Sequence, residues 1–235
     1  MVYRMNSVPV LFEDKEILIV DKAAGIAVQG GAGISHSLDK ELPRQLGCAV
    51  HLVHRLDRDT AGLMLVAKSS AAAAKWTALI ASGQVRKEYR AVCIGRPPMR
   101  HGTLRSAVNA HGRVRSALTE YAVERAYSAA IPPELQESAA ARELQLTELR
   151  LVLGTGRMHQ IRIQTAQAGF PILADDRHGD FRLNKLARRL LGARQLFLLS
   201  QRLCVPLGRG ARIFEASVPC HFKNLYMRLN NEIKT

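Results

Sequence analysis

Two short segments of this chain carry side chains that can do chemistry together. The first, His54-Arg55-Leu56-Asp57, ends in a carboxylate that Arg58 follows directly. The second, Gly156-Arg157-Met158-His159-Gln160-Ile161-Arg162, ends in a cation near the start of an expected helix. A neighbouring cation lowers the pKa of a carboxyl group and keeps it ionised. If the fold joins the two segments, Asp57 becomes a nucleophile for an electrophilic carbon, held ionised by Arg162.

Both residues also have ordinary structural roles open to them. A lone acidic residue in a loop is usually solvated or caps a helix, and Arg162 can be a surface cation. Asp59 is expected to cap the turn at residues 60–62. Tyr89 lies in an expected strand, where a tyrosine more often packs in the core. Near an ionised Asp57, its ring can instead stack on a nucleobase and its hydroxyl can move a proton.

His51 and His54 raise the question of a metal site. Their segment is expected to be strand and turn, and no further Cys or carboxylate stands at a recognised ligand spacing. The four cysteines form no Cys-x-x-Cys pair, so we expect buried thiols rather than disulfides or zinc ligands. We therefore expect no metal, and a metal hydrolase ranks last among the functions considered.

The charge balance predicts an anionic partner. The 34 Lys and Arg residues outnumber the 20 Asp and Glu residues, for a net charge of +14. Nucleic acid is the leading candidate, and a solvated basic surface without a bound polymer is the alternative. Apolar types make up 47% of the 235 residues, enough for a folded core. With no secretory signal and no run of ~18 apolar residues, we expect a soluble, reduced, cytoplasmic protein with no membrane association.

Strands and a few helices must position the site residues. Apolar or alternating runs predict strands over 17–20, 62–67, 86–94 and 149–153, and closing strands within 194–218. Helices are expected over about 70–82, 158–168 and 183–191, and after Pro219. The Ala-, Ser- and Pro-rich segment 127–142 is expected to be a surface excursion. Many strands, few helices and no regular βαβ alternation predict an α+β fold with a mixed, mainly antiparallel sheet and flanking helices.

The helix expected over 183–191 has a strongly charged side. Its leucines lie on one face, and Lys185, Arg188 and Arg189 lie largely elsewhere. A solvated helix face is the commoner explanation of such a pattern. Beside an RNA site, the same face can grip phosphates.

The first segment resembles the catalytic motif of a known enzyme family. His54-Arg55-Leu56-Asp57-x-x-Thr60-x-Gly62-Leu63, followed by Lys68, is similar to that motif in the RluA-type RNA pseudouridine synthases. The likeness runs from residue 12 to the C-terminal helix. Its further matches, in order, are Lys22-x-x-Gly25, Lys87-Glu88-Tyr89-Arg90-Ala91, Ala117-x-Thr119-x-Tyr121, the Gly156–Arg162 segment and Gly169-Phe170-Pro171-Ile172-Leu173-Ala174-Asp175-Asp176.

The resemblance implies a mixed sheet with a central RNA-binding cleft and isomerisation of uridine in ribosomal or transfer RNA to pseudouridine. It implies neither cofactor nor metal. By motif match, Asp57 is the nucleophile, Tyr89 the active-site tyrosine that stacks on the base, and Arg162 the ion-pair partner. The target uridine must leave its stack, because an enzyme cannot reach a stacked base. Arg55 then occupies the vacated space.

The other residues of the two motifs are expected to contact RNA. They are Arg55, Arg58, His54, Arg157, His159 and Gln160. In the implied reaction, Asp57 either attacks C1′ or stabilises a glycal, the N1–C1′ bond breaks, and uracil rejoins through C5. The sequence leaves both routes open, and Tyr89 is the candidate base for the C5 proton.

Four positions depart from the family pattern. Family members usually carry Ser at Ala61, Pro at Ala23 and Tyr at His178, and often His at Leu199. These departures leave the subgroup open, and with it the target RNA. We expect residues 1–235 to form a single catalytic domain, without a separate S4-like RNA-binding domain, that acts as a monomer.

A protein that keeps the fold and binds RNA or the ribosome without catalysis is the alternative function. Asp57, Tyr89 and Arg162 favour the enzyme, because a protein that only binds RNA has no need of all three.

Overall fold

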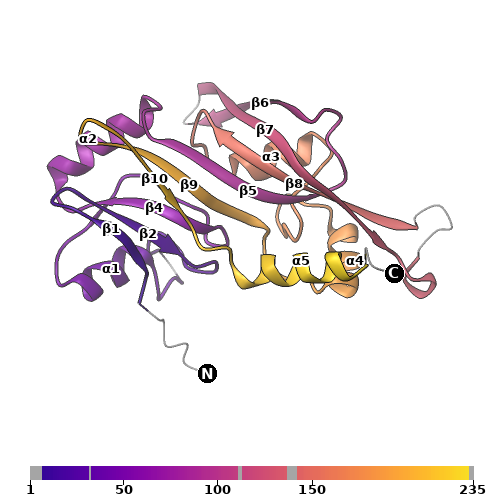
Figure 1. Cartoon of the computed structure of the whole chain (residues 1–235). Helices are drawn as coiled ribbons and strands as arrows, with labels where there is room; N and C mark the ends of the chain where they lie inside the picture. The colour runs from indigo at the N-terminus through magenta and orange to yellow at the C-terminus, as the bar shows by residue number, and fades with distance from the viewer. Residues whose placement is uncertain (1–6, 32, 111–112, 137–141, 233–235) are drawn as a thin grey trace. The chain divides into compact units, whose positions relative to one another are not determined.

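The computed structural model describes residues 7–31, 33–110, 113–136 and 142–232 (Figure 1). The chain divides into two compact units. The first unit contains residues 1–87 and 200–217, and the second contains residues 88–199 and 218–235. Strands β5 (Arg86–Ile94) and β9 (Leu198–Leu207) carry the chain from one unit to the other.

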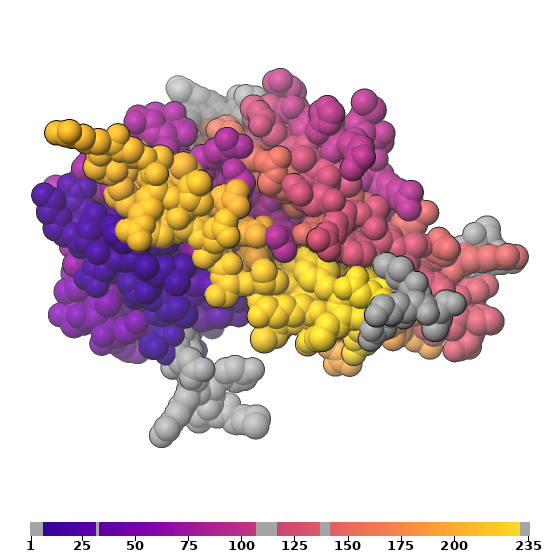
Figure 2. All heavy atoms as spheres, viewed as in Figure 1, coloured from indigo at the N-terminus to yellow at the C-terminus, as the bar shows by residue number. Residues whose placement is uncertain are grey.

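The first unit is built on strands that the apolar runs predict. Its strand order is β1 (Val10–Glu13), β2 (Ile17–Lys22), β4 (Ala61–Ala67) and β9. The short β3 (His51–Leu52) pairs with β4, and β10 (Gly210–Glu215) pairs with β9 at the surface (Figure 2). Every residue of β4 is buried, which explains why its sequence is apolar without alternation.

Two helices belong to the first unit. Helix α2 (Ser70–Ala81) was expected from sequence; the Ser69 hydroxyl accepts a hydrogen bond from the Ala72 N–H at 3.1 Å and caps it. Helix α1 (Leu38–Leu46) was not expected, because Pro43 inside it removes one helical hydrogen bond. Leu38 and Leu42 are fully buried, and this burial outweighs the unfavourable proline.

The second unit contains an antiparallel sheet in the order β5, β8 (Glu143–Leu153), β7 (Arg113–Ala130) and β6 (His101–Ala110). The surface excursion predicted over 127–142 is wrong at its start. Residues 127–130 continue β7 and pair with β8, because Tyr127 and Ala129 turn inward and are buried. A single 3₁₀ turn follows at Pro133–Leu135, and residues 137–141 lie outside the described residues.

Three helices complete the second unit: α3 (Gln160–Gln167), α4 (Phe181–Leu191) and α5 (Cys220–Glu232). The Asp180 carboxylate accepts from the N–H groups of Arg182 and Leu183, both at 2.9 Å, and begins α4. Gly192, at φ 68°, ends it. These elements confirm the predicted α+β class with mainly antiparallel strand pairing. None of the helices described is long and apolar enough to cross a membrane.

All four cysteines are free thiols, as expected, but the expectation that they are buried is wrong for two of them. Cys48 in the first unit and Cys220 in the second are exposed, and Cys204 is partly buried. Cys93 is fully buried in β5, and burial raises the pKa of its thiol.

Candidate active site

Asp57 lies in the loop between β3 and β4 of the first unit. Leu56 is buried and anchors the loop, and the Thr60 N–H donates to the Asp57 carbonyl at 3.2 Å to close a turn. The Asp57 side chain is half-buried, with the exposed Arg58 beside it. Asp59 accepts a hydrogen bond from Arg58 Nε at 3.1 Å. The loop therefore presents Asp57 from a fixed backbone.

Lys22, at the end of β2, holds this loop from inside. Its fully buried ammonium group donates to the carbonyls of Ala23, Ile26 and Arg58 at 3.0, 2.9 and 2.9 Å. The Arg58 carbonyl also accepts from the N–H of Gly25, whose φ of 87° suits glycine. Two contacts thus fix the peptide that follows Arg58. The sequence motif marked Lys22 but did not show this role.

The ammonium group of Lys22 interacts electrostatically with the carboxylates of Asp57 and Asp59. Burial lowers the pKa of its ammonium group to about 7, and the charges of Asp59 and Asp57 partly oppose that shift.

His54 and Arg55 precede Asp57 on the same loop. His54 Nε2 accepts from the Leu65 N–H at 3.0 Å, so its proton belongs on Nδ1. Burial, together with the nearby Lys87 ammonium, lowers the pKa of His54 to about 3. The imidazole is therefore neutral, whereas Arg55 is exposed and charged.

Arg162 lies on α3 in the second unit and forms a buried ion pair with Asp175. Its Nε and Nη2 donate to the two carboxylate oxygens of Asp175 at 2.9 and 2.7 Å. Only 7% of Arg162 and 1% of Asp175 is exposed. Burial raises the pKa of Asp175, but hydrogen bonds from Arg162 and the N–H groups of His178 and Arg177 lower it below its usual value overall. The pair fixes the plane of the guanidinium.

The turn that follows Asp175 is built around this carboxylate. Asn184, on the buried face of α4, accepts from the Ala174 N–H at 2.8 Å and donates to the Asp175 carbonyl at 3.0 Å. A Cβ on Gly179 would lie 2.4 Å from the same carbonyl oxygen, so only glycine fits there. Sequence reasoning assigned no role to Asp175 or Asn184. A polar Asn on the apolar side of a helix is the signal that marks such a residue.

Tyr89 lies on β5 and is buried, with 6% exposed. It pairs in register with Leu151 of β8. The predicted alternation is confirmed: Tyr89, Ala91 and Cys93 are buried, and Arg86 on the other face is exposed.

The segment before α3 places the remaining site residues of the second unit. The Gln160 amide donates to the Leu118 carbonyl and the Thr119 hydroxyl, both at 2.9 Å. Its oxygen accepts from the Arg157 N–H at 3.0 Å and the Thr155 hydroxyl at 2.7 Å. All hydrogen-bonding positions of this amide are therefore used within the protein.

His159, which precedes α3, has the positive φ of 52°. Its Nδ1 lies 2.8 Å from His178 Nε2. Neither the sequence pattern nor the helix capping rules predicted this histidine pair, because its partner comes from the Asp175 turn. The Arg157 Nε is buried without a hydrogen-bond partner among the described residues.

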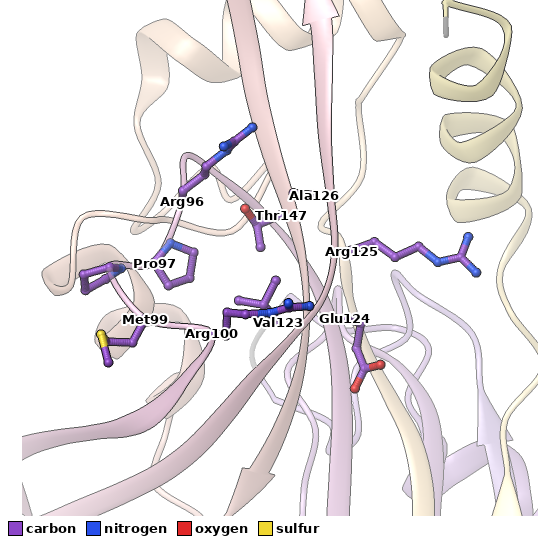
Figure 3. Close-up of a pocket in the computed structure, with 10 residues that line it drawn as sticks. Arg96, Pro97, Met99, Arg100, Val123, Glu124, Arg125, Ala126 and Thr147 are labelled. Atoms are coloured by element: carbon purple, nitrogen blue, oxygen red, sulfur yellow. The ribbon is translucent and has the colours of Figure 1, made fainter. Parts of the chain in front are cut away.

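A pocket of about 300 Å³ lies elsewhere in the second unit, between the β5–β6 connection and the bulge of β7 (Figure 3). In the close-up, Arg100 lies across Val123, whereas Arg125 points away from the pocket. None of the predicted site residues lines it. The candidate active site is therefore distinct from this pocket.

The structure groups the predicted site residues by unit. The first unit holds Asp57 with His54, Arg55 and Arg58, and the second holds Tyr89 and Arg162 with Arg157, His159 and Gln160. The Asp57–Arg162 ion pair and the RNA contacts stay predictions. Among the described residues, no three His, Cys, Asp or Glu side chains gather as a metal-binding group.

Comparison with known proteins identifies the family. The model of the RNA pseudouridylate synthase family matches residues 16–167. The ribosomal large subunit pseudouridine synthase C of Haemophilus influenzae is 32% identical over 225 residues, which cover 94% of this chain and 68% of that protein. The protein of the same name from Rickettsia prowazekii is 31% identical over 214 residues, covering 90% and 68%.

Solved structures share the fold. Human RNA pseudouridylate synthase domain containing 4 superposes with a TM-score of 0.73 at 23% identity, covering 94% of this chain and 92% of that one. For human RNA pseudouridylate synthase domain containing 1, the TM-score is 0.69 at 19% identity, with 90% and 84% covered. The resemblance found in the sequence is confirmed, and the chain belongs to the RNA pseudouridylate synthase family of isomerases.

Proposed function

We propose that this enzyme isomerises specific uridines in structured ribosomal or transfer RNA to pseudouridine, with Asp57 as the nucleophile. Family membership supports the reaction class. The observation that carries the residue assignment is the Asp57 loop, whose backbone at Arg58 is held by both Lys22 and Gly25. A carboxylate on a fixed loop beside a buried cation is pre-organised to attack.

The reaction begins when the target uridine leaves its stack, and Arg55 fills the space it vacates. Asp57 then attacks C1′ or stabilises a glycal, and the N1–C1′ bond breaks. The uracil turns, and a C5–C1′ bond forms in its place. The C5 proton leaves, with Tyr89 as the base, and N1, which carries no proton in uridine, takes one up, so that an N1–H bond replaces the C5–H bond in the product. Because substrate and product are isomers, no electrons are gained or lost, and the proposal assigns no cofactor.

Arg162 is the proposed ion-pair partner of Asp57. A guanidinium has five N–H donors, and the bonds to Asp175 occupy two of them. A guanidinium can bind two carboxylates, so the proposed contact with Asp57 is compatible with the bonds to Asp175, which fix its plane. In this proposal, Asp175 positions Arg162, and Arg162 keeps Asp57 ionised.

The RNA to test first is the large-subunit ribosomal RNA, because the Haemophilus and Rickettsia relatives are named for that subunit. Transfer RNA is the second substrate to test. A uridine in a loop is the expected target, since an unstacked base costs less to extrude.

Asp57→Asn tests the nucleophile. We expect it to abolish tritium release from in vitro transcribed RNA labelled at uridine C5, because an amide is not a nucleophile at this carbon. RNA binding, measured by filter retention, should persist. Asp59→Asn is the matched control, since it removes a neighbouring charge from the same loop and should keep most activity.

Full tritium release by the Asp57→Asn protein would overturn the assignment. Equal losses in both variants would assign the effect to the charge of the loop rather than to Asp57.

A further inference from the structure

The outer face of α4 carries a concentration of positive charge that the reaction does not explain. Lys185, Arg188 and Arg189 are all exposed there, and Phe181, at the start of the helix, is 66% exposed. The helix itself contains no acidic residue, and the capping carboxylate of Asp180 is engaged with backbone N–H groups.

Some exposed cations of the protein are paired with a carboxylate, as in Lys75–Glu16 at 2.7 Å and Arg150–Glu124 at 3.0 Å, whereas the three cations on the outer face of α4 have no such partner among the described residues. Within the part of the chain that the structure describes, none of Lys185, Arg188 and Arg189 forms an ion pair. Lys185 stands three and four positions before the two arginines, a spacing at which like charges repel on a helix.

The helix dipole accounts for only part of this pattern. Arg188 and Arg189 lie in the last turn, where cations stabilise a helix. Lys185 is outside that turn, and a further cation comes from α5. A Cβ added to Gly192, which ends α4, would lie 3.2 Å from Nη1 of Arg228, so this guanidinium lies against the end of α4.

We propose that this surface binds RNA. Its residues, called here the α4 basic face, are Phe181, Lys185, Arg188, Arg189 and Arg228. The cations bind phosphates of the substrate strand, and Phe181 stacks on an unpaired base. Charge complementarity selects the partner, because phosphate groups supply the anions that the helix lacks.

The opposite face of α4 fixes this surface relative to Arg162. Asn184 bonds the backbone on both sides of the Ala174–Asp175 peptide, and Asp175 holds the Arg162 guanidinium. The α4 basic face is thus about one helix diameter, ~10 Å, from the turn that positions the proposed catalytic arginine. RNA bound there is held in register with Arg162. This coupling rests on the proposed function.

The test removes charge from the face while leaving the site intact. In the triple variant, Lys185, Arg188 and Arg189 are each changed to Gln, and large-subunit ribosomal RNA transcribed in vitro with tritium at uridine C5 is the probe. We expect a higher KM with little change in kcat. The slope of log affinity against log salt should become shallower by about 2 to 3, since each lost phosphate contact contributes about 0.7 to 0.9.

A second triple variant is the matched control, because it loses the same charge from exposed cations of the first unit. Its substitutions are Lys15→Gln, Lys40→Gln and Arg44→Gln. We expect its KM and salt slope to stay close to wild type. Equal changes in both triple variants, or no change in the α4 triple variant, would overturn the proposal and leave an acidic protein as the partner to test.

Phe181→Leu tests the stacking contact without a change in charge. We expect about tenfold weaker RNA binding with an unchanged salt slope. An unchanged affinity overturns the stacking contact.

A failure of the proposed reaction can be distinguished from a failure of the proposed RNA surface. If the wild-type protein binds these RNAs but releases no tritium, and the α4 triple variant still weakens binding, the RNA surface stands and the proposed reaction falls.

Discussion

Asp175 is the residue on which the orientation of Arg162 depends. Its carboxylate accepts two hydrogen bonds from the guanidinium and one each from the N–H groups of Arg177 and His178 at 3.0 Å. Because its pKa is lowered in the folded protein, the stability it contributes is present above the pKa of the unfolded chain. That stability is lost as the pH falls through the lower folded value.

Asp175→Asn should therefore affect both stability and turnover. Removing the charge breaks the buried Arg162–Asp175 ion pair, and breaking such a pair by neutralising one member typically costs about 3 to 5 kcal/mol. We expect a loss of this order in the free energy of unfolding, measured in urea at pH 7, and a fall in kcat for tritium release. Asp176→Asn, at the exposed neighbour, is the control. A stable Asp175→Asn protein with normal kcat would show that Arg162 holds its position unaided.

Lys22 predicts an unusual pH dependence of stability. Its folded pKa of about 7 is below the ordinary value of 10.5, so between these pH values the unfolded chain binds more protons. The free energy of unfolding therefore rises with pH across this window, by up to about 1.4 kcal/mol per pH unit from this group. Below pH 7 both states are protonated, and the contribution is constant.

The measurement compares wild type with Lys22→Met in urea at pH 7.5, 8.5 and 9.5. The wild-type protein should gain stability relative to the variant as the pH rises. The control is Lys75→Met, which replaces a half-exposed cation paired with Glu16. Its free energy of unfolding should change with pH as that of the wild-type protein does. If the free energy of unfolding of Lys22→Met changes with pH as that of wild type does, the Lys22 amine has an ordinary pKa in the folded protein.

At the scale of elements, the turn from Ala174 to Asp180 joins α4 to the proposed site. Ala174 adopts a φ of 58°, unusual for a residue with a Cβ, and the Asn184 side chain holds it there. Gly179 passes so close to the Asp175 carbonyl that no side chain fits. Three hydrogen bonds therefore hold this turn. The Asn184 side chain bonds the Ala174 N–H and the Asp175 carbonyl, and the Gly179 N–H donates to the same carbonyl.

Gly179→Ala should disturb this turn. Its Cβ would meet backbone at 2.4 Å, so the turn must shift and Asp175 with it. We expect destabilisation of about 1 to 3 kcal/mol, as for other strained or overpacked positions, and a lower kcat. Gly210→Ala serves as the control, because a Cβ there meets nothing within 4 Å. Stability would be measured by thermal melts of both variants, and kcat by tritium release. If Gly179→Ala has the same stability and kcat as the control, the close approach at Gly179 does not position Asp175.

The elements that the sequence predicted well are those in which local pattern and packing agree. The apolar run of β4, the capped α2 and the alternating β5 follow from their residues alone. Helix α1 did not, since Pro43 argues against a helix that burial of its leucines then stabilises. The end of β7 was missed because its Ala- and Ser-rich composition resembles a loop, whereas pairing with β8 makes it a strand.

At the scale of the whole molecule, the net charge of +14 predicts how RNA binding responds to salt. Lysines and arginines that bind phosphates release counterions, so affinity should fall steeply with ionic strength. We expect a slope of log affinity against log salt steeper than about −3, measured by filter retention between 50 and 200 mM salt. A slope near zero would contradict an electrostatic RNA surface.

The sequence predicted the family and the candidate active-site residues, but not the contacts that hold them. Motif spacing singled out Asp57, Tyr89 and Arg162, and the motif positions are local. Lys22 reaches the Arg58 carbonyl across 36 positions of sequence, and Asn184 and Asp175 meet only when α4 folds back. Such pairs depend on tertiary packing, which no single-sequence periodicity encodes.

The positions of the thiols allow a distance between the two units to be measured with dyes attached to native cysteines. Cys48 and Cys220 are exposed and stand in different units, whereas Cys93 is shielded and its raised pKa keeps it unreactive. After Cys204→Ser, a donor dye and an acceptor dye on the two exposed positions would measure the separation of the units by energy transfer. Titrating RNA into this labelled protein would follow that separation through binding and turnover, without any cysteine being introduced.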